Sequence, residues 1–262
     1  MESRERRSQF QIQPRYLEDK EWETVALQEG LFYEAIEMFS PPVLGNEHLT
    51  EDCLRWYMAG GRTLSVHGAF IDVNPASSDM AVRSQARRRC QESCHIAAKV
   101  GAKNIVFHSS CATFLRGMYL DSWAGVCAEY YEELAQKSGL RIWIENSQDI
   151  DAVPLMELMK RISSPQIGVC LDLGHAHYSH LSIEQWFDCL GERIGYLHLS
   201  DNNGVWDEHL PLGEGNIDWE KADRCWRAAD RVMPITIEVG NLEDLQRSIR
   251  FLKENGYFGM DS

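Results

Sequence analysis

Residues Ile142-Trp143-Ile144-Glu145 form a short apolar run that ends in a carboxylate. Five further runs end in a histidine or an acid in the same way: Leu64-Ser65-Val66-His67, Ile105-Val106-Phe107-His108, Val169-Cys170-Leu171-Asp172, Gly195-Tyr196-Leu197-His198 and Ile235-Thr236-Ile237-Glu238. Runs of this length and composition are typical of buried β-strands. Because helix-sized stretches separate them, we expect a ring of parallel strands that points imidazoles and carboxylates at one place.

The whole chain alternates between strand-like and helix-like segments. The pattern predicts strands near residues 9–13, 31–39, 63–67, 104–108, 141–145, 167–172, 194–199 and 234–239. It predicts helices near residues 18–29, 48–60, 79–100, 121–138, 152–162, 182–190, 218–230 and 242–255. Eight such units fit a barrel of about 250 residues. We therefore expect an α/β fold, a single (β/α)8 TIM barrel domain over residues 1–262, in which residues 1–8 form a flexible tail.

Strand periodicity predicts which side chains face the inside of the barrel. Residues two apart share a face of a strand, so Ile142 and Ile144 point one way while Trp143 and Glu145 point the other. The isoleucines suit contact with the surrounding helices. The acidic residue then lies inside the barrel at the C-terminal end of its strand, where barrel enzymes place their active sites.

Composition limits the classes of partner. A hydrophobic fraction of 44% and a charged fraction of 25% are those of a soluble globular protein. The formal net charge of -14 disfavours non-specific binding to nucleic acid or to anionic membranes. We see no apolar signal segment at the start and no apolar run long enough for a bilayer. The cysteines form no CxxC pair, so we expect reduced thiols and a cytoplasmic location.

Four of the strand ends predict a metal site. Glu145, Asp172, His198 and Glu238 come from four consecutive predicted strands and can converge on one ion. Three carboxylates and one imidazole suit Mn or Mg and tolerate Zn or Co. The alternative for any one of them is a buried residue bonded to backbone, but four unpaired buried groups in one place would be costly.

Two loop motifs lie next to these strand ends. His175 starts the loop that follows Asp172, so both side chains can lean over the barrel mouth. Asp207 and His209 are two apart, a spacing that suits chelation in extended chain. For these two residues, metal binding, substrate contact and a role in loop structure all stay open.

The motifs together resemble those of a known superfamily. The segment from His198 to Trp219, with Asp201-Asn202-Asn203-Gly204 and Gly213-Glu214-Gly215 inside it, looks like the strand-seven signature of the xylose isomerase-like TIM barrels. Further matches are Val66-His67-Gly-Ala-Phe70, Ile144-Glu145-Asn146 and Cys170-Leu-Asp172-Leu-Gly-His175. The superfamily includes sugar-phosphate isomerases and epimerases, inosose dehydratases and endonuclease IV.

The isomerase and epimerase branches imply one divalent metal held by Glu145, Asp172, His198 and Glu238. The ion would hold neighbouring oxygens of a sugar or polyol, and Glu145 or Glu238 would remove a proton beside the carbonyl to give an enediolate. Substrate contacts or additional metal contacts would fall to His67, His108, His175, Asp207 and His209, with Phe70 and Trp206 covering the substrate.

Endonuclease IV implies a different use of the same residues. Its three zinc ions take nine ligands, and every one has a counterpart here: His67, His108, Glu145, Asp172, His175, His198, Asp207, His209 and Glu238. Against this reading, the chain lacks the His-, Ser- and Gly-rich first strand of that family and a basic stripe with interleaved aromatics for DNA.

We therefore predict a divalent-metal-dependent sugar, sugar-phosphate or polyol isomerase or epimerase. The alternatives are an apurinic-site endonuclease with three zinc ions and a non-catalytic sugar-binding or subunit role. We expect a small-molecule sugar or polyol as the partner, and we expect no binding to nucleic acid or membranes. We also consider a homo-oligomer, because oligomers are frequent in the resembled families.

Overall fold

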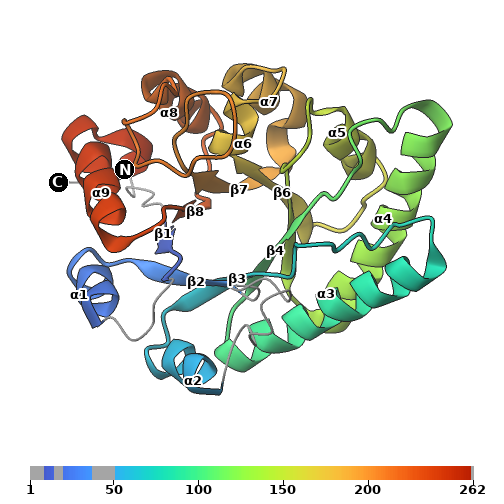
Figure 1. The fold of residues 1–262 in the computed structure, drawn as a ribbon, viewed down its shortest axis with the longest axis horizontal. Coiled ribbons are helices and arrows are strands. Elements are labelled where there is room, and N and C mark those ends of the chain that lie inside the picture. The colour runs from blue at the N-terminus through green and yellow to red at the C-terminus, as the bar shows by residue number, and fades with distance from the viewer. Residues whose placement is uncertain (1–8, 15–19, 37–50, 261–262) are drawn as a thin grey trace, which may run out of the picture.

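The structure, a computed structural model, describes residues 9–14, 20–36 and 51–260. Within these residues, eight strands close into one barrel in sequence order, and the last strand pairs with the first. All neighbouring strands are parallel. In Figure 1 the helices lie around the outside of this ring. The predicted (β/α)8 barrel is confirmed, while the expected tail at residues 1–8 lies outside the described residues.

The strands lie where the sequence predicts them. They are β1 (Gln9–Ile12), β2 (Phe32–Ile36), β3 (Thr63–His67), β4 (Asn104–His108), β5 (Arg141–Glu145), β6 (Ile167–Asp172), β7 (Ile194–Leu199) and β8 (Pro234–Ile237). The end of the strand expected at 31–39 falls beyond the described residues.

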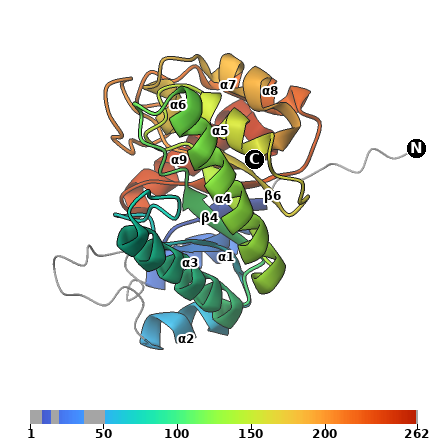
Figure 2. The ribbon, with the colours of Figure 1, turned by 90° about the vertical axis from the view of Figure 1, so that its right-hand side faces the viewer.

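The helices cover the barrel in the same order. They are α1 (Lys20–Gln28), α2 (Glu51–Ala59), α3 (Met80–Val100), α4 (Gly117–Ser138), α5 (Val153–Met159), α6 (Leu173–His177), α7 (Ile183–Leu190), α8 (Trp219–Ala228) and α9 (Leu242–Asn255), with 3₁₀ turns at η2 (Gly191–Arg193) and η3 (Tyr257–Gly259). The long helices α3 and α4 lie side by side in Figures 1 and 2. No helix in the described part of the chain has the length and apolar character of a membrane span.

Two helix predictions need correction. Helix α4 begins at Gly117 rather than residue 121, because Arg116 precedes it without a side-chain cap bond and so leaves no capping signal in the sequence. The residues after Asp172 form the short helix α6 rather than a loop. Asp172 Oδ1 accepts a hydrogen bond from the His175 N–H at 2.6 Å and so caps this helix.

The predicted alternation of faces is confirmed by two separate apolar clusters. Ile142 and Ile144 belong to the large cluster between the strands and the helices. Inside the barrel, a small cluster is formed by residues that each stand two positions before a His, Glu or Asp at or next to a strand end: Val106, Trp143, Cys170 and Tyr196. The barrel interior is therefore packed directly beneath its polar strand ends.

Two glycines make room for the indole of Trp143. A Cβ built at Gly195 would lie 2.5 Å from Trp143 Cζ3, and one built at Gly168 would lie 2.6 Å from the same atom. The indole N–H donates to Asn104 Oδ1 at 3.0 Å, which fixes the ring in place. Strands β6 and β7 therefore need a residue without a side chain at these points.

We predict that Gly195→Ala destabilises the protein by about 1–3 kcal/mol, because the added methyl group overpacks the ring. The matched control is Gly125→Ala in the interior of α4, where a Cβ meets nothing within 4 Å. The control should be up to about 1 kcal/mol more stable than the wild type. Urea unfolding measures both, and equal stabilities of the two variants would contradict this packing.

Candidate metal centre

The strand ends meet on one rim of the barrel. His67, His108, Glu145 and Asp172 are the last residues of β3, β4, β5 and β6. The register pairs His108 with Glu145 and Asp172 with His198. Because all strands run the same way, these side chains surround one point at the C-terminal end of the barrel.

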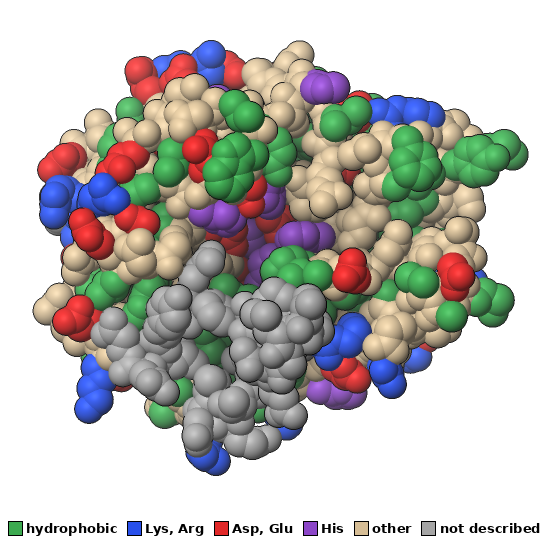
Figure 3. All heavy atoms as spheres, viewed as in Figure 1, with side chains coloured by type: hydrophobic (Ala, Val, Ile, Leu, Met, Phe, Trp, Pro, Cys, Tyr) green, Lys and Arg blue, Asp and Glu red, His purple; other side chains and the backbone are tan. Residues whose placement is uncertain are grey.

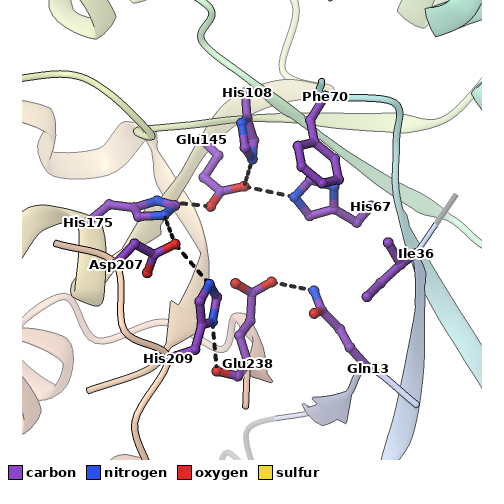
Figure 4. A pocket seen from close by; sticks show the side chains of 10 residues that line it. All are labelled: Gln13, Ile36, His67, Phe70, His108, Glu145, His175, Asp207, His209 and Glu238. Atoms are coloured by element: carbon purple, nitrogen blue, oxygen red, sulfur yellow. Dashed lines mark hydrogen bonds and ion pairs between the residues drawn. The ribbon is translucent and has the colours of Figure 1, made fainter. Parts of the chain in front are cut away.

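A hollow of about 180 Å³ opens at this point. In Figure 3 histidine and acidic side chains are visible at its floor. The side chains that line it converge from around the rim (Figure 4): Gln13, Ile36, His67, Phe70, His108, Glu145, His175, Asp207, His209 and Glu238. Asp172 and His198 are completely buried beside this lining.

The four residues predicted as ligands come together. Glu145, Asp172, His198 and Glu238 each offer a ligand atom, and these atoms lie within 4.8 Å of one another. His198 Nδ1 lies 3.3 Å from Glu145 Oε1 and 3.2 Å from Glu238 Oε1. This cluster can bind a metal ion, because its donors are the oxygens and imidazole nitrogen that divalent ions take in proteins.

Unpartnered atoms within the group show that the donors fit such an ion. Glu145 Oε1, Asp172 Oδ2 and His198 Nδ1 are buried and form no hydrogen bond with the described residues, although the Glu145 and His198 atoms lie 3.3 Å apart. Buried polar atoms are rarely left without a partner, so three in one cluster need a common explanation. A cation between them would provide it.

The electrostatics of the group lead to the same conclusion. Burial opposes ionisation of Glu145, but the neighbouring imidazoles, His198 foremost, together outweigh it and hold the pKa of Glu145 well below its usual range. Burial raises the pKa of Asp172 to about 7, and the charges of Glu145 and Glu238 add to this effect. Burial and two neighbouring carboxylates therefore oppose the ionisation of Asp172, and a bound cation would offset this effect.

A second set of side chains lies on the other side of Glu145. Its Oε2 atom is 3.2 Å from His67 Nε2 and 3.6 Å from His108 Nε2. Burial lowers the pKa of His108 to about 3, so this imidazole is neutral at physiological pH. Neutral imidazoles are metal ligands, and these three residues form a further group that can hold an ion.

The loop between β7 and α8 brings Asp207 and His209 to the hollow. Asp207 Oδ2 lies 2.9 Å from His209 Nε2 and 3.3 Å from His175 Nε2. His209 has a φ of 50°, a left-handed conformation that side chains rarely adopt, and its Nδ1 is 3.0 Å from the Glu238 carbonyl oxygen. Strain of this kind persists only where the surrounding contacts hold it.

Asp201 fixes this loop through hydrogen bonds to residues at its far end. Its completely buried carboxylate accepts hydrogen bonds from Trp219 Nε1 at 2.7 Å and from the Gly213 N–H at 2.8 Å. A Cβ at Gly215 would lie 2.3 Å from Asp201 Oδ1. The Gly213-Glu214-Gly215 segment is thus a turn that returns the loop to α8.

Comparison with known proteins matches residues 27–255 to the xylose isomerase-like TIM barrel. The chain belongs to this family. An uncharacterised protein of Methanocaldococcus jannaschii is 30% identical over 201 residues, which cover 72% of this chain and 68% of the relative. A probable endonuclease 4 of Mycobacterium ulcerans is 26% identical over 210 residues, which cover 75% of this chain and 80% of that protein.

A solved structure agrees with the family match. The crystal structure of a D-tagatose 3-epimerase-like protein superposes with a TM-score of 0.76 at 25% identity, over 94% of this chain and 96% of that one. The named relatives are an epimerase-like protein and a probable endonuclease, and both names describe enzymes. This similarity supports the view that the present chain is an enzyme of the xylose isomerase-like family.

The structure brings together most of the residues that the sequence singled out. All nine His, Asp and Glu candidates lie at the barrel mouth, and Phe70 forms part of the wall, with its ring 5.0 Å from those of His67 and His108. Trp206 differs, because its side chain is 62% exposed and does not line the hollow. Its role in covering a substrate stays a prediction.

Two polar residues of the site were missed. Gln13, after β1, lines the hollow, and Glu34, on β2, is completely buried behind it. A signal for Glu34 exists in the sequence, since a carboxylate stands in the middle of the apolar run Phe32-Tyr33-Glu34-Ala35-Ile36. Strand alternation places it on the inner face, opposite Tyr33 and Ala35.

Asp149 ties the end of β4 to the loop after β5. Its Oδ2 atom accepts hydrogen bonds from Ser109 Oγ at 2.6 Å and from the Ser147 N–H at 3.2 Å. Ser109 directly follows His108, so Asp149 helps to fix the backbone that carries this imidazole. Burial raises the pKa of Asp149 to about 6.

We predict that Asp149 makes stability decrease with pH. Because its folded pKa lies above the unfolded value, the folded state binds more protons between about pH 4 and pH 6, and stability is lost as pH rises through this window. In Asp149→Asn this loss is absent, so the variant should gain roughly 1–3 kcal/mol on the wild type from pH 4 to pH 7. Urea titrations of metal-free protein test this, and a constant difference between the two proteins would contradict it.

Proposed function

We propose that this protein is a divalent-metal-dependent isomerase or epimerase that acts on a sugar or polyol. The observation that carries the proposal is the group of Glu145, Asp172, His198 and Glu238, whose ligand atoms lie within 4.8 Å of one another. The unpartnered buried atoms of three of these residues support a bound ion. Three carboxylates and one imidazole favour Mn or Mg and tolerate Zn or Co.

A bound divalent ion would act as a Lewis acid that stabilises negative charge on oxygens of the substrate and helps to orient them. The proton transfer would fall to the two glutamates that line the hollow. Glu145 on β5 and Glu238 after β8 reach His198 Nδ1 from different strands. One removes the proton beside the carbonyl to give an enediolate, and the other returns a proton from its own side.

The remaining lining suits a polyhydroxylated substrate. His175, Asp207 and His209 present hydrogen-bonding groups on one side of the hollow, and Phe70 presents an apolar ring on another. No Lys or Arg of the described residues lines this hollow, which favours an uncharged sugar over a phosphorylated one. The likeness to a D-tagatose 3-epimerase-like protein supports the same reaction class.

We predict that Glu145→Gln and Glu238→Gln each lower turnover by roughly 10²–10⁴-fold, because a positioned acid–base group is lost. The assay is incorporation of deuterium from heavy water at the carbon beside the carbonyl, across a panel of ketoses and aldoses with metal added. Glu129→Gln, an exposed carboxylate of α4, is the matched control and should behave as the wild type. Full activity in both site variants would refute the proposed proton transfer.

A second candidate rests on the additional ligand groups. His67, His108 and Glu145 can hold a further ion, and His175, Asp207 and His209 form a chain of contacts beside it. Several ions in this arrangement would favour a hydrolase like the probable endonuclease 4 relatives. Metal-loaded protein that cuts a duplex at a single abasic site, and leaves an intact duplex uncut, would put this function first.

A further inference from the structure

A buried polar network lies behind the candidate metal group, and the proposed reaction does not use it. Its centre is Glu34, whose side chain is completely buried in the barrel. The carboxylate contacts five side chains: Gln13, Ser65, Tyr196, His198 and Thr236. A buried charge is costly unless its contacts stabilise it, so these five contacts are needed to keep Glu34 ionised inside the barrel.

Glu34 is held rigidly by hydroxyl groups. Tyr196 on β7 donates a short hydrogen bond to Oε2, and the same oxygen is 3.2 Å from Ser65 Oγ on β3 and 3.3 Å from Thr236 Oγ1 on β8. The Tyr196 oxygen also accepts from Gln11 Nε2 at 2.7 Å. Because its contacts come from several strands, the carboxylate cannot turn without breaking bonds on different sides of the barrel.

His198 connects this network to the metal group. Its Nε2 atom lies 3.2 Å from Glu34 Oε1, while its Nδ1 atom on the opposite side lies between Glu145 and Glu238. A carboxylate beside Nε2 keeps a proton on that nitrogen, so the lone pair of a neutral imidazole is on Nδ1. Nδ1 is also the buried ring nitrogen that forms no hydrogen bond with the described residues.

Gln13 makes a second connection. Its Nε2 atom donates to Glu34 Oε1 at 2.7 Å and forms a short hydrogen bond to Glu238 Oε1. One amide nitrogen with two hydrogens thus bridges two carboxylates. The position of Glu238 is therefore set relative to Glu34, in the same way as the ring of His198.

We propose that Glu34 is a positioning residue for the metal site. It holds His198 with Nδ1 facing the other ligands, and through Gln13 it sets the position of Glu238. The inference rests on the proposed metal-dependent function and adds a residue that touches neither the ion nor the substrate. Outer carboxylates that orient a histidine ligand raise metal affinity by fixing its ring and its protonated nitrogen.

The test measures metal binding rather than turnover. Metal-free full-length Glu34→Gln is titrated with Co²⁺ in competition with a chromophoric chelator, and the visible absorption of the bound Co²⁺ reports its coordination. We expect roughly 10–100-fold weaker binding than in the wild type and an altered Co²⁺ spectrum. The matched control is Asp223→Asn, which makes a carboxylate-to-amide change at a buried acid of α8 whose partners, Arg227 and the Phe258 N–H, lie outside the network. It should bind Co²⁺ as the wild type does.

The outcomes separate this inference from the proposed function. If the wild type binds no divalent ion, the proposed function fails and the inference fails with it. If the wild type binds Co²⁺ and Glu34→Gln binds it equally well, with the same spectrum, only the role of Glu34 is overturned. An equal loss in Asp223→Asn would also overturn it, because the effect would then come from general loosening of the barrel.

A second variant covers the case in which Glu34→Gln does not fold. Gln13→Met keeps the length of the side chain but removes the bridge between Glu34 and Glu238. We expect weaker Co²⁺ binding with a melting temperature of the metal-free protein close to that of the wild type. Unchanged affinity in this variant would show that Gln13 does not position Glu238.

Discussion

Four carboxylates surround one imidazole inside a closed barrel: Glu34, Glu145, Asp172 and Glu238 around His198. Carboxylates so deep in a protein need either hydrogen-bond donors or a cation. The hydrogen bonding of Glu34 differs from that of the carboxylates nearer the barrel mouth. Glu34 is surrounded by hydroxyl, amide and imidazole donors, whereas Glu145 and Asp172 each keep a buried oxygen that forms no hydrogen bond with the described residues. The carboxylate oxygens that lack a hydrogen-bond donor therefore belong to Glu145 and Asp172, near the barrel mouth.

The fold makes this distribution of charge tolerable. Parallel strands put the polar ends on one rim, and Trp143, seated against two glycines, packs the barrel interior beneath them. The loop anchored by Asp201 then carries Asp207 and His209 over the rim. The buried carboxylates at the barrel mouth repel one another and so lower the stability of the metal-free protein. A bound metal ion would offset this repulsion and stabilise the folded state.

Much of this could be predicted from the sequence. The pattern of apolar runs ending in His, Asp or Glu located the barrel strands and the residues that meet at the rim, because alternation within a strand determines the face. What could not be predicted depends on contacts between distant segments. Glu34 is 164 positions from its partner His198. The exposure of Trp206 likewise depends on a loop path that periodicity does not describe.

The most direct test of the account is the metal content of the protein, measured by elemental analysis after purification without chelator or affinity-tag metal. The account predicts one tightly bound Mn, Mg, Co or Zn per chain, and loss of that ion in Asp172→Asn. A protein that holds no divalent ion, and takes none up when it is supplied, would contradict the central claim. Three zinc ions per chain would instead favour the nuclease function.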